Sequence, residues 1–370
     1  MSDIFFKDIF SNLPDNCLID TNTPGKTLED SLTRTLSLLK NTVIQQKHPR
    51  WIVTYSGGKD STIVTLLAIE VMRRKIEWRP DSVDIIYVDT LQEIPPLHQQ
   101  ALDFLEYIET LAIKDSIAIK SYIAYPDMQR RFWYLMFGKG YPPPNRLFWW
   151  CTPKLKVKPA QAILRKLNYN DAAVVLSGIR FGESQDRDRR IKKQSSCVGQ
   201  GECGQVLEYN HAIAPIAHWK LCQVWDMLAL YAPAWGWPTV PLVKLYGDST
   251  IRFGCWTCTL VKRDRALEAV VENPEWTGLK AMGQFRDLLL QKAANPQNRL
   301  LHADGHPGRF KLEIRQELLD GLKQLERELN MPLIDCEEEE AIRQLWQKES
   351  PRIDEPVCLE RRENVTESIG

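Results

Sequence analysis

The chain has 370 residues, with 48 Lys and Arg balanced by 48 Asp and Glu, so its formal net charge is zero. This length accommodates one large α/β domain with a smaller one, or two domains. Overall neutrality gives no global attraction to nucleic acid, so any DNA contact has to come from local basic patches. No apolar run approaches the roughly 18 residues of a membrane span, and the opening residues do not read as a signal peptide. We therefore expect a cytoplasmic protein with no membrane partner.

The first strong pattern in the chain is a strand, a turn and a helix. Before it, Thr27 is placed to cap a helix that runs to about Gln46. The β-branched and aromatic residues of 51–55 then predict a buried strand, and 56–61 predicts a tight turn. An apolar stripe predicts that the next helix covers 63–74.

The turn at 56–61 carries the features of a phosphate or pyrophosphate site. Gly57 and Gly58 let backbone N–H groups approach an anion, and the following helix points its positive dipole end at the same place. Lys59 adds a charge, and Ser56 and Ser61 add hydroxyl donors. The spacing differs from both the Walker A loop and the dinucleotide-binding G-x-G-x-x-G pattern.

Further strands are predicted at 84–90, 117–124 and 172–177, with a helix at 97–111 between the first two. This order predicts an α/β fold, an open parallel sheet with helices on both faces. The segment 263–348 predicts a mostly helical C-terminal region.

We expect four segments along the chain. The segments are a helical arm at 1–47, a nucleotide-binding α/β domain at 48–210, a cluster-bearing helical region at 211–348, and a poorly ordered tail at 349–370. Within the third segment, the acidic run 335–340 is expected to be the solvated start of a helix.

Two strand ends carry polar candidates, because ligands of open α/β sheets bind beyond the carboxyl ends of the strands. Asp89 ends the second strand and is either a contact for ribose, adenine or Mg²⁺, or a helix N-cap. Gly178 and Arg180 follow the fourth strand, and the position of Arg180 beside two glycines favours phosphate contact.

Cysteines form a candidate metal site. Cys255 and Cys258 make a C-x-x-C pair that can share one metal, which fits zinc, an iron–sulfur cluster or a redox dithiol. A closed site of four cysteines needs two further ligands, for which we choose Cys151 and Cys203, with Cys197 as the alternative to Cys203. Cys222, between Leu221 and Trp225, is expected in the core.

Basic and aromatic residues interleave around Cys151. Lysines and arginines suited to a polyanion or a charged sulfur donor follow it, namely Lys154, Lys156, Lys158, Arg165 and Lys166. A second basic cluster is Arg187, Arg189, Arg190, Lys192 and Lys193, for which a solvated surface is an equal alternative. Phe132, Trp133, Trp149 and Trp150 alternate with Arg130, Arg131 and Arg146 and either stack on bases or, more often for tryptophan, pack in a core.

The stretch 56–62 resembles the PP-loop of ATP pyrophosphatases, which split ATP between its α and β phosphates. Together with 151–159, it resembles the PAPS reductase-like branch of that superfamily. Four further stretches and the segment 178–184 resemble the DndC/SspD-like sulfurtransferases of DNA phosphorothioation. The four are Phe132-Trp133, Gly138-Lys-Gly-Tyr-Pro142, Trp150-Cys-Thr152 and Arg252-Phe-Gly-Cys-Trp-Thr-Cys258.

The resemblance implies an adenine nucleotide alpha hydrolase-like fold with ATP, Mg²⁺ and a [4Fe–4S] cluster as cofactors. It implies DNA, a cysteine desulfurase as sulfur donor and other DNA phosphorothioation subunits as partners. The implied catalytic residues are Lys59, Asp60 and Arg180. The implied nucleotide-binding residues are Ser56, Gly57, Gly58, Lys59, Asp60, Ser61, Thr62, Asp89, Gly178 and Arg180, and the cluster ligands are Cys151, Cys203, Cys255 and Cys258.

Three other functions share the loop. PAPS and APS reductases resemble one another in a C-terminal Glu-Cys-Gly-x-His nucleophile, which the stretch 356–360 does not match. A tRNA sulfurtransferase would bring an RNA-binding module, and none is recognised in the sequence. A non-catalytic subunit that binds nucleotide and bridges partners is the third alternative.

Overall fold

The computed structural model describes residues 27–45, 47–168, 172–182, 212–247, 251–303 and 305–349. The chain divides into two compact units, each discontinuous in sequence. The sheet unit is Met1–Val88, Pro95–Ala124 and Ala160–Phe253, and the helical unit is Asp89–Ile94, Tyr125–Pro159 and Gly254–Gly370. The four sequence segments expected above stay a prediction.

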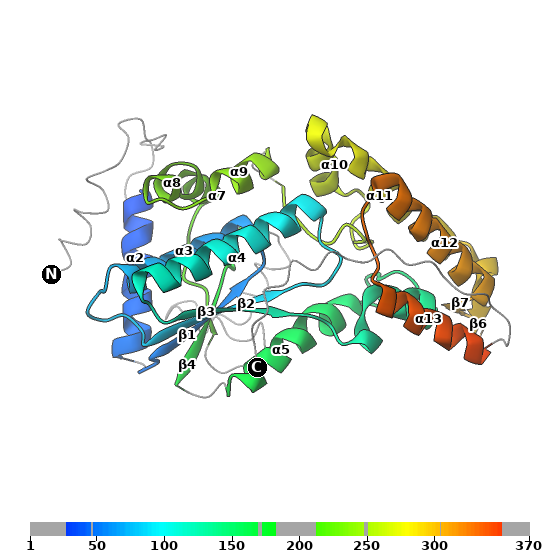
Figure 1. The fold of residues 1–370 in the computed structure, drawn as a ribbon, viewed down its shortest axis with the longest axis horizontal. Helices are drawn as coiled ribbons and strands as arrows, with labels where there is room; N and C mark the ends of the chain where they lie inside the picture. Colours follow the sequence, from blue (N-terminus) through cyan, green and yellow to red (C-terminus); the bar gives the residue numbers. More distant parts are fainter. Residues whose placement is uncertain are drawn as a thin grey trace. The chain divides into compact units, whose positions relative to one another are not determined.

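The sheet unit is built on a five-stranded, wholly parallel sheet in the order β3-β2-β1-β4-β5 (Figure 1). The four predicted strands are confirmed to within two residues at each end. The fifth strand was not predicted because it is only two residues long. The order runs outward from β1 in both directions, so the topological switch point lies between β1 and β4. The strands are β1 (Arg50–Tyr55), β2 (Ser82–Val88), β3 (Ile119–Ala124), β4 (Ala173–Ser177) and β5 (Ala212–Ile213).

Helices cover both faces of this sheet, as predicted. Successive side chains of a strand point to opposite faces. Ile52 of β1 accordingly lies in one core cluster with Leu164 of α5. Its neighbour Trp51 faces the other way and donates its indole N–H to Thr42 of α2, 3.0 Å away. The flanking helices are α2 (Leu28–Ile44), α3 (Lys59–Arg73), α4 (Pro95–Asp115) and α5 (Lys158–Lys166).

The structure confirms the predicted start of one helix, α2, and corrects that of the next, α3. The cap of α2 is confirmed, because Thr27 and Asp30 form a reciprocal capping box. The prediction that α3 starts at residue 63 was wrong, since it starts at Lys59. The polar residues 59–62 form its first turn, where the Ser61 and Thr62 hydroxyls donate to the Gly58 carbonyl, so no apolar stripe marks the start of the helix.

Short helices complete the sheet unit after β5. The expectation that Cys222 lies in the core was wrong, because its side chain is exposed. The helix that carries it buries the next two residues, Gln223 and Val224, and Cys222 falls on the opposite side. These helices are α7 (Leu221–Asp226), the π-helical turn η4 (Met227–Tyr231), α8 (Ala232–Ala234) and α9 (Val240–Tyr246).

The helical unit is organised around Trp133. Its ring stacks on Phe137 at 4.8 Å and contacts Trp256 and Phe285, and its indole N–H donates to the Leu333 carbonyl. In the described ranges, no helix is long and apolar enough to cross a membrane. The elements are the short turns η1 (Met128–Arg130), η2 (Tyr134–Gly138), η3 (Thr152–Val157), η5 (Pro274–Leu279) and η6 (Pro296–Asn298). The helices are α10 (Arg265–Glu272), α11 (Lys280–Ala294), α12 (Leu312–Leu329) and α13 (Cys336–Glu349), with the hairpin β6 (Arg299–Leu301) and β7 (Pro307–Phe310).

The acidic run at the start of α13 is not fully solvated, so that expectation was wrong for two of its members. Glu338 is buried and accepts a hydrogen bond from the Tyr134 backbone N–H. Glu339 is also buried and pairs with Lys323 and Arg343. The carboxylates are buried because each has a partner inside the unit.

Candidate active site

The loop between β1 and α3 lies at the switch point of the sheet, at the carboxyl end of its central strand (Figure 1). Its sharp turn depends on Gly57, whose φ is +73°. A side chain at this position would also meet Ala101 of α4, because a Cβ there would lie 2.8 Å from the Ala101 Cβ. The close approach of α4 and the left-handed backbone together require glycine.

Hydroxyl groups close the loop on itself. Ser56 donates its backbone N–H to the Ser61 hydroxyl over 3.1 Å, and the two serine hydroxyls are 3.0 Å apart. Ser61 and Thr62 both donate to the Gly58 carbonyl over 2.9 Å. Within the described part of the chain, the N–H groups of Gly57 and Gly58 donate no hydrogen bond. These two donors therefore remain available to an anion.

A buried carboxylate joins the two cations predicted for the site. Asp60 lies 3.0 Å from the Lys59 ammonium and 2.9 Å from the Arg180 guanidinium, and all three residues are buried. Two positive charges against one negative charge leave this group with a net positive charge. Tyr246 adds a contact that the sequence did not suggest. Its hydroxyl accepts from the Lys59 N–H over 3.1 Å, and its ring lies 5.2 Å from the Lys59 ammonium.

Gly178 brings the end of β4 against the start of α3. A Cβ on Gly178 would lie 2.6 Å from the Ser61 N and 2.8 Å from the Asp60 carbonyl carbon. This close approach places Arg180, two residues further on, within reach of Asp60. Glu183, Ser184 and the second basic cluster lie outside the described residues.

Three of the four predicted cluster ligands, Cys151, Cys255 and Cys258, lie in the helical unit, where the segment Asp89–Ile94 meets the C-x-x-C turn. Glu93 and Cys255 form an isolated antiparallel bridge, and Trp256 donates its N–H to the Gln92 carbonyl. The Thr90 hydroxyl lies 3.5 Å from the Cys255 sulfur. Asp89 is buried here and caps its own loop by accepting from the Leu91 N–H.

Lys156 interacts with several acidic groups of this site. The Cys255 thiol has the largest effect and raises the pKa of Lys156, burial lowers it, and Glu93, Cys151 and Cys258 raise it further, so that the net change is upward. Burial, opposed by Lys156, raises the pKa of Cys255 to about 11. Burial and the neighbouring Asp89 raise the pKa of Glu93 to about 7. Three of the four predicted thiols therefore interact with one ammonium group.

The fit of this site to a metal cluster is partial. Thiolates suit iron–sulfur clusters and zinc, and three of the predicted ligands are grouped around Lys156. Within the described residues, however, no three His, Cys, Asp or Glu side chains are arranged to hold a metal ion. Cys203 and its alternative Cys197 lie outside the described residues.

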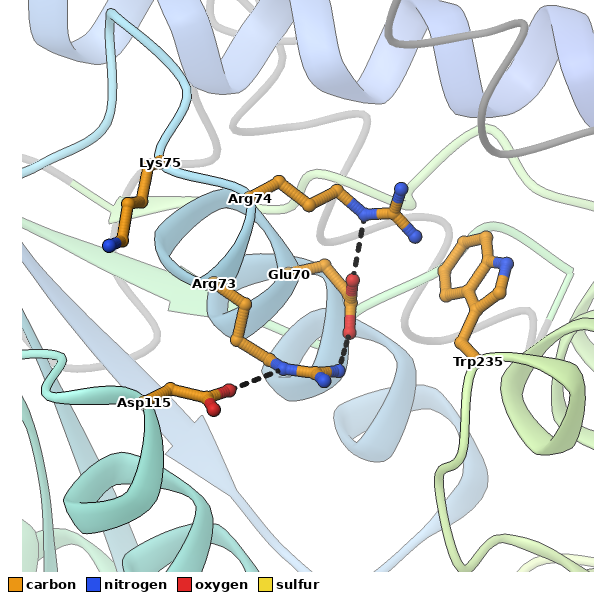
Figure 2. Close-up of a pocket in the computed structure, with 6 residues that line it drawn as sticks. All are labelled: Glu70, Arg73, Arg74, Lys75, Asp115 and Trp235. Carbon is orange, nitrogen blue, oxygen red and sulfur yellow. Dashed lines mark hydrogen bonds and ion pairs between the residues drawn. The ribbon is translucent and has the colours of Figure 1, made fainter.

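A pocket of about 460 Å³ lies at the other end of α3, in the sheet unit. Figure 2 shows two guanidinium groups, those of Arg73 and Arg74, gathered on the Glu70 carboxylate. Glu70 is eleven residues beyond Lys59, about 16 Å along the helix. Arg73 also pairs with Asp115, so this cluster fixes the end of α3 rather than offering unpaired charges to a ligand.

Comparisons with known proteins identify relatives of the chain. Two uncharacterized proteins of Methanocaldococcus jannaschii, MJ0066 and MJ0973, are 26% and 23% identical to it. The matches cover 60% and 70% of this chain, but only 38% and 55% of the relatives' own lengths.

Solved structures give distant matches. The phosphate complex of the PAPS reductase of Candida auris is 17% identical, covering 65% of this chain and 98% of that one, with a TM-score of 0.35. An FMN adenylyltransferase of Candida glabrata is 13% identical, covering 61% and 63% of the two chains, with a TM-score of 0.35. The match to the phosphoadenosine phosphosulfate reductase domain family spans residues 50–261, more than half of the sequence, and the chain therefore belongs to that family.

Proposed function

We propose that this chain is an ATP-dependent sulfurtransferase. It adenylates a DNA backbone phosphate, which activates that phosphate for replacement of a non-bridging oxygen by sulfur. The observation that carries the proposal is the loop at the switch point, where the Gly57 and Gly58 N–H groups, without a partner among the described residues, lie beside Lys59, Asp60 and Arg180. Donors and cations of this kind stabilise the charge that builds up on pyrophosphate as it leaves. The family supports the coarser conclusion that the chain is a nucleotide-using enzyme of the PP-loop superfamily.

In the proposed first step, a non-bridging oxygen of the DNA phosphate attacks the α-phosphorus of ATP. The bond to the β-phosphate breaks, and pyrophosphate leaves with the electron pair. Lys59 and Arg180 would stabilise that charge together with the N–H groups of Gly57 and Gly58. Asp60 holds both cations in place. Because both of its oxygens are already paired with these cations, Asp60 does not fit as a Mg²⁺ ligand.

In the proposed second step, sulfide attacks the activated DNA phosphorus. The desulfurase delivers it as persulfide sulfur, which a thiol reductant reduces by two electrons to sulfide as the reductant becomes a disulfide. The new P–S bond forms as the bond to the AMP oxygen breaks. Cys151, Cys255 and Cys258, with Cys203 as the fourth ligand, would hold a [4Fe–4S] cluster, which supplies sulfur-binding or redox chemistry when present. Lys156 would balance the negative charge of the thiolates. A cysteine desulfurase and other phosphorothioation subunits are the proposed partners.

A second candidate is reduction of a sulfonucleotide such as PAPS, which the matching family favours. The loop at 56–62 would then hold the phosphate or sulfate of the nucleotide, and no ATP would be split. The two functions differ in their products, which are pyrophosphate in one case and sulfite in the other.

Exchange of labelled pyrophosphate into ATP, measured with and without DNA, tests the proposal. We expect exchange that depends on DNA, and we expect Lys59→Met to reduce it by at least about a hundredfold because a phosphate-stabilising charge is lost. Lys114→Met is the control, since Lys114 is exposed near the end of α4. Sulfite formation from PAPS without any pyrophosphate release would contradict the proposal and support the reductase.

A further inference from the structure

A short exposed loop precedes Cys151 in the helical unit, and we call residues 145–149 the tip. The Leu147 side chain is 100% exposed, and Phe148 and Trp149 are 41% and 43% exposed. The Asn145 side-chain oxygen accepts hydrogen bonds from the N–H groups of Leu147 and Phe148, both over 2.9 Å. This side-chain cap fixes the turn that presents the three apolar residues.

The tip is anchored on both sides. Before it, the carbonyl of Pro142 accepts from the Trp150 indole over 3.0 Å, and that of Pro144 accepts from the Thr259 hydroxyl over 2.6 Å. The Tyr141 ring lies 5.6 Å from that of Phe148 and 5.7 Å from that of Trp150. Because the base of the loop is packed and hydrogen-bonded, the exposed apolar side chains are held outward by the fold.

The structure separates the aromatic residues that the sequence grouped together. Phe132, Trp133 and Trp150 are buried, which confirms core packing for these three. Only Trp149 of the four is exposed, and it lies in the tip. An exposed cluster of large apolar side chains is uncommon unless it contacts a partner.

The charge around the tip indicates the kind of partner. Between Asp127 and Asp171 the sequence has no acidic residue, although the chain as a whole is neutral. Lys154 lies over the Tyr141 ring, next to the tip, at 5.9 Å. The basic residues of this stretch that belong to the helical unit are Arg130, Arg131, Lys139, Arg146, Lys154, Lys156 and Lys158.

We propose that the tip binds unpaired bases of a nucleic acid, with Trp149 and Phe148 as stacking surfaces and Leu147 as a wedge. Arg146 and Lys154 contact the flanking phosphates. The inference rests on the proposed function, because it names the place where the DNA substrate is held. Trp149 is two residues from Cys151, at most about 7 Å along the chain. The bound strand is thereby kept beside the first of the cysteines.

Binding of a fluorescein-labelled single-stranded oligonucleotide to the full chain, followed by fluorescence anisotropy, tests this inference. We expect Trp149→Ala to weaken binding about tenfold, because a stacking surface is lost. We expect Arg146→Ala to reduce the slope of log affinity against log salt by about one, because one phosphate contact is lost. Leu301→Ser is the matched control, since Leu301 is 66% exposed in the same unit.

The outcomes separate this inference from the proposed function. Loss of binding in the Trp149 variant, without any pyrophosphate exchange by the parent chain, supports the tip and contradicts the proposed function. DNA-dependent exchange with unchanged binding in both tip variants overturns the tip and leaves the function standing. A parent chain that binds no oligonucleotide, but forms a dimer that Leu147→Ser dissociates, also overturns the inference and assigns the tip to protein association.

Discussion

Asp60 holds the two cations of the candidate phosphate site, Lys59 and Arg180, in position. A buried ammonium or guanidinium group without a counter-charge costs several kcal/mol, on the order of 3–5 when one partner of a pair is removed. Asp60 offsets that cost for both Lys59 and Arg180 at once. The carboxylate therefore keeps the pair of cations in place before any phosphate arrives, and this ordering is what a preorganised phosphate site requires.

Replacing Asp60 with asparagine tests this role. We expect Asp60→Asn to lower the free energy of unfolding by about 3–5 kcal/mol, because two buried cations lose their partner. Denaturant unfolding of the purified chain measures the change. Asp127→Asn is the control, because the Asp127 side chain is 71% exposed in its pair with Arg130. That control should lose less than about 1 kcal/mol. Equal losses in the two variants would contradict the role of Asp60.

At the scale of single residues, the sequence predicted which residues form the phosphate site better than it predicted the contacts that those residues make. Lys59, Asp60 and Arg180 were all named from the motif and its neighbouring strand end, and the structure brings them together. The contact of Lys59 with Tyr246 was not predicted, since 187 residues separate the two and no motif links them. Burial of Glu339 was missed for the same reason, because its partner Lys323 lies on another helix.

At the scale of elements, four strands were predicted correctly because each is a run of five to seven mostly β-branched and apolar residues. The start of α3 was missed because its first turn is polar, with two hydroxyls that donate to the Gly58 carbonyl and no apolar stripe. The strand β5 and the hairpin of β6 and β7 were missed because each strand has only two to four residues. Pairing with a distant segment determines such strands, and local propensity does not.

The contact between β4 and α3 gives a prediction for these two elements. A Cβ at Gly178 would meet backbone atoms of Asp60 and Ser61 at less than 3 Å, so Gly178→Ala must shift the start of α3. We expect a loss of about 1–3 kcal/mol in unfolding free energy, as for other overpacked sites. We also expect weaker ATP binding, measured by calorimetry.

The control for this prediction is Gly278→Ala, because a Cβ at Gly278 would have no atom within 4 Å. That variant should bind ATP like the parent chain. Unchanged ATP affinity in Gly178→Ala would show that the strand end and the loop are not held in register by this glycine.

For the whole molecule, the discontinuous units could not be predicted from the order of segments along the chain. The helical unit takes the six residues after β2 together with 125–159 and the C-terminal part of the chain. Packing explains why the stretch 138–142, which the sequence analysis singled out, belongs to the helical unit. The Gly138 carbonyl accepts from Arg315 of α12, which also pairs with Glu349 of α13. The stretch 138–142 is thus tied to the C-terminal helices of its own unit.

The division also yields a prediction about the two candidate sites. The contacts described above for Lys59 lie within the sheet unit, and those for Cys255 lie within the helical unit. We therefore expect Cys255→Ser to lose most of the iron of anaerobically purified protein while its affinity for ATP stays within about twofold, since sites that share no partners behave independently. Lys59→Met should show the reverse, with weakened ATP binding and full iron content. Cys222→Ser, at an exposed thiol, should change neither quantity.

Iron loss in the Lys59 variant, or weakened ATP binding in the Cys255 variant, would show that the two sites depend on each other. Full iron content in Cys255→Ser would instead remove this cysteine from the proposed ligands.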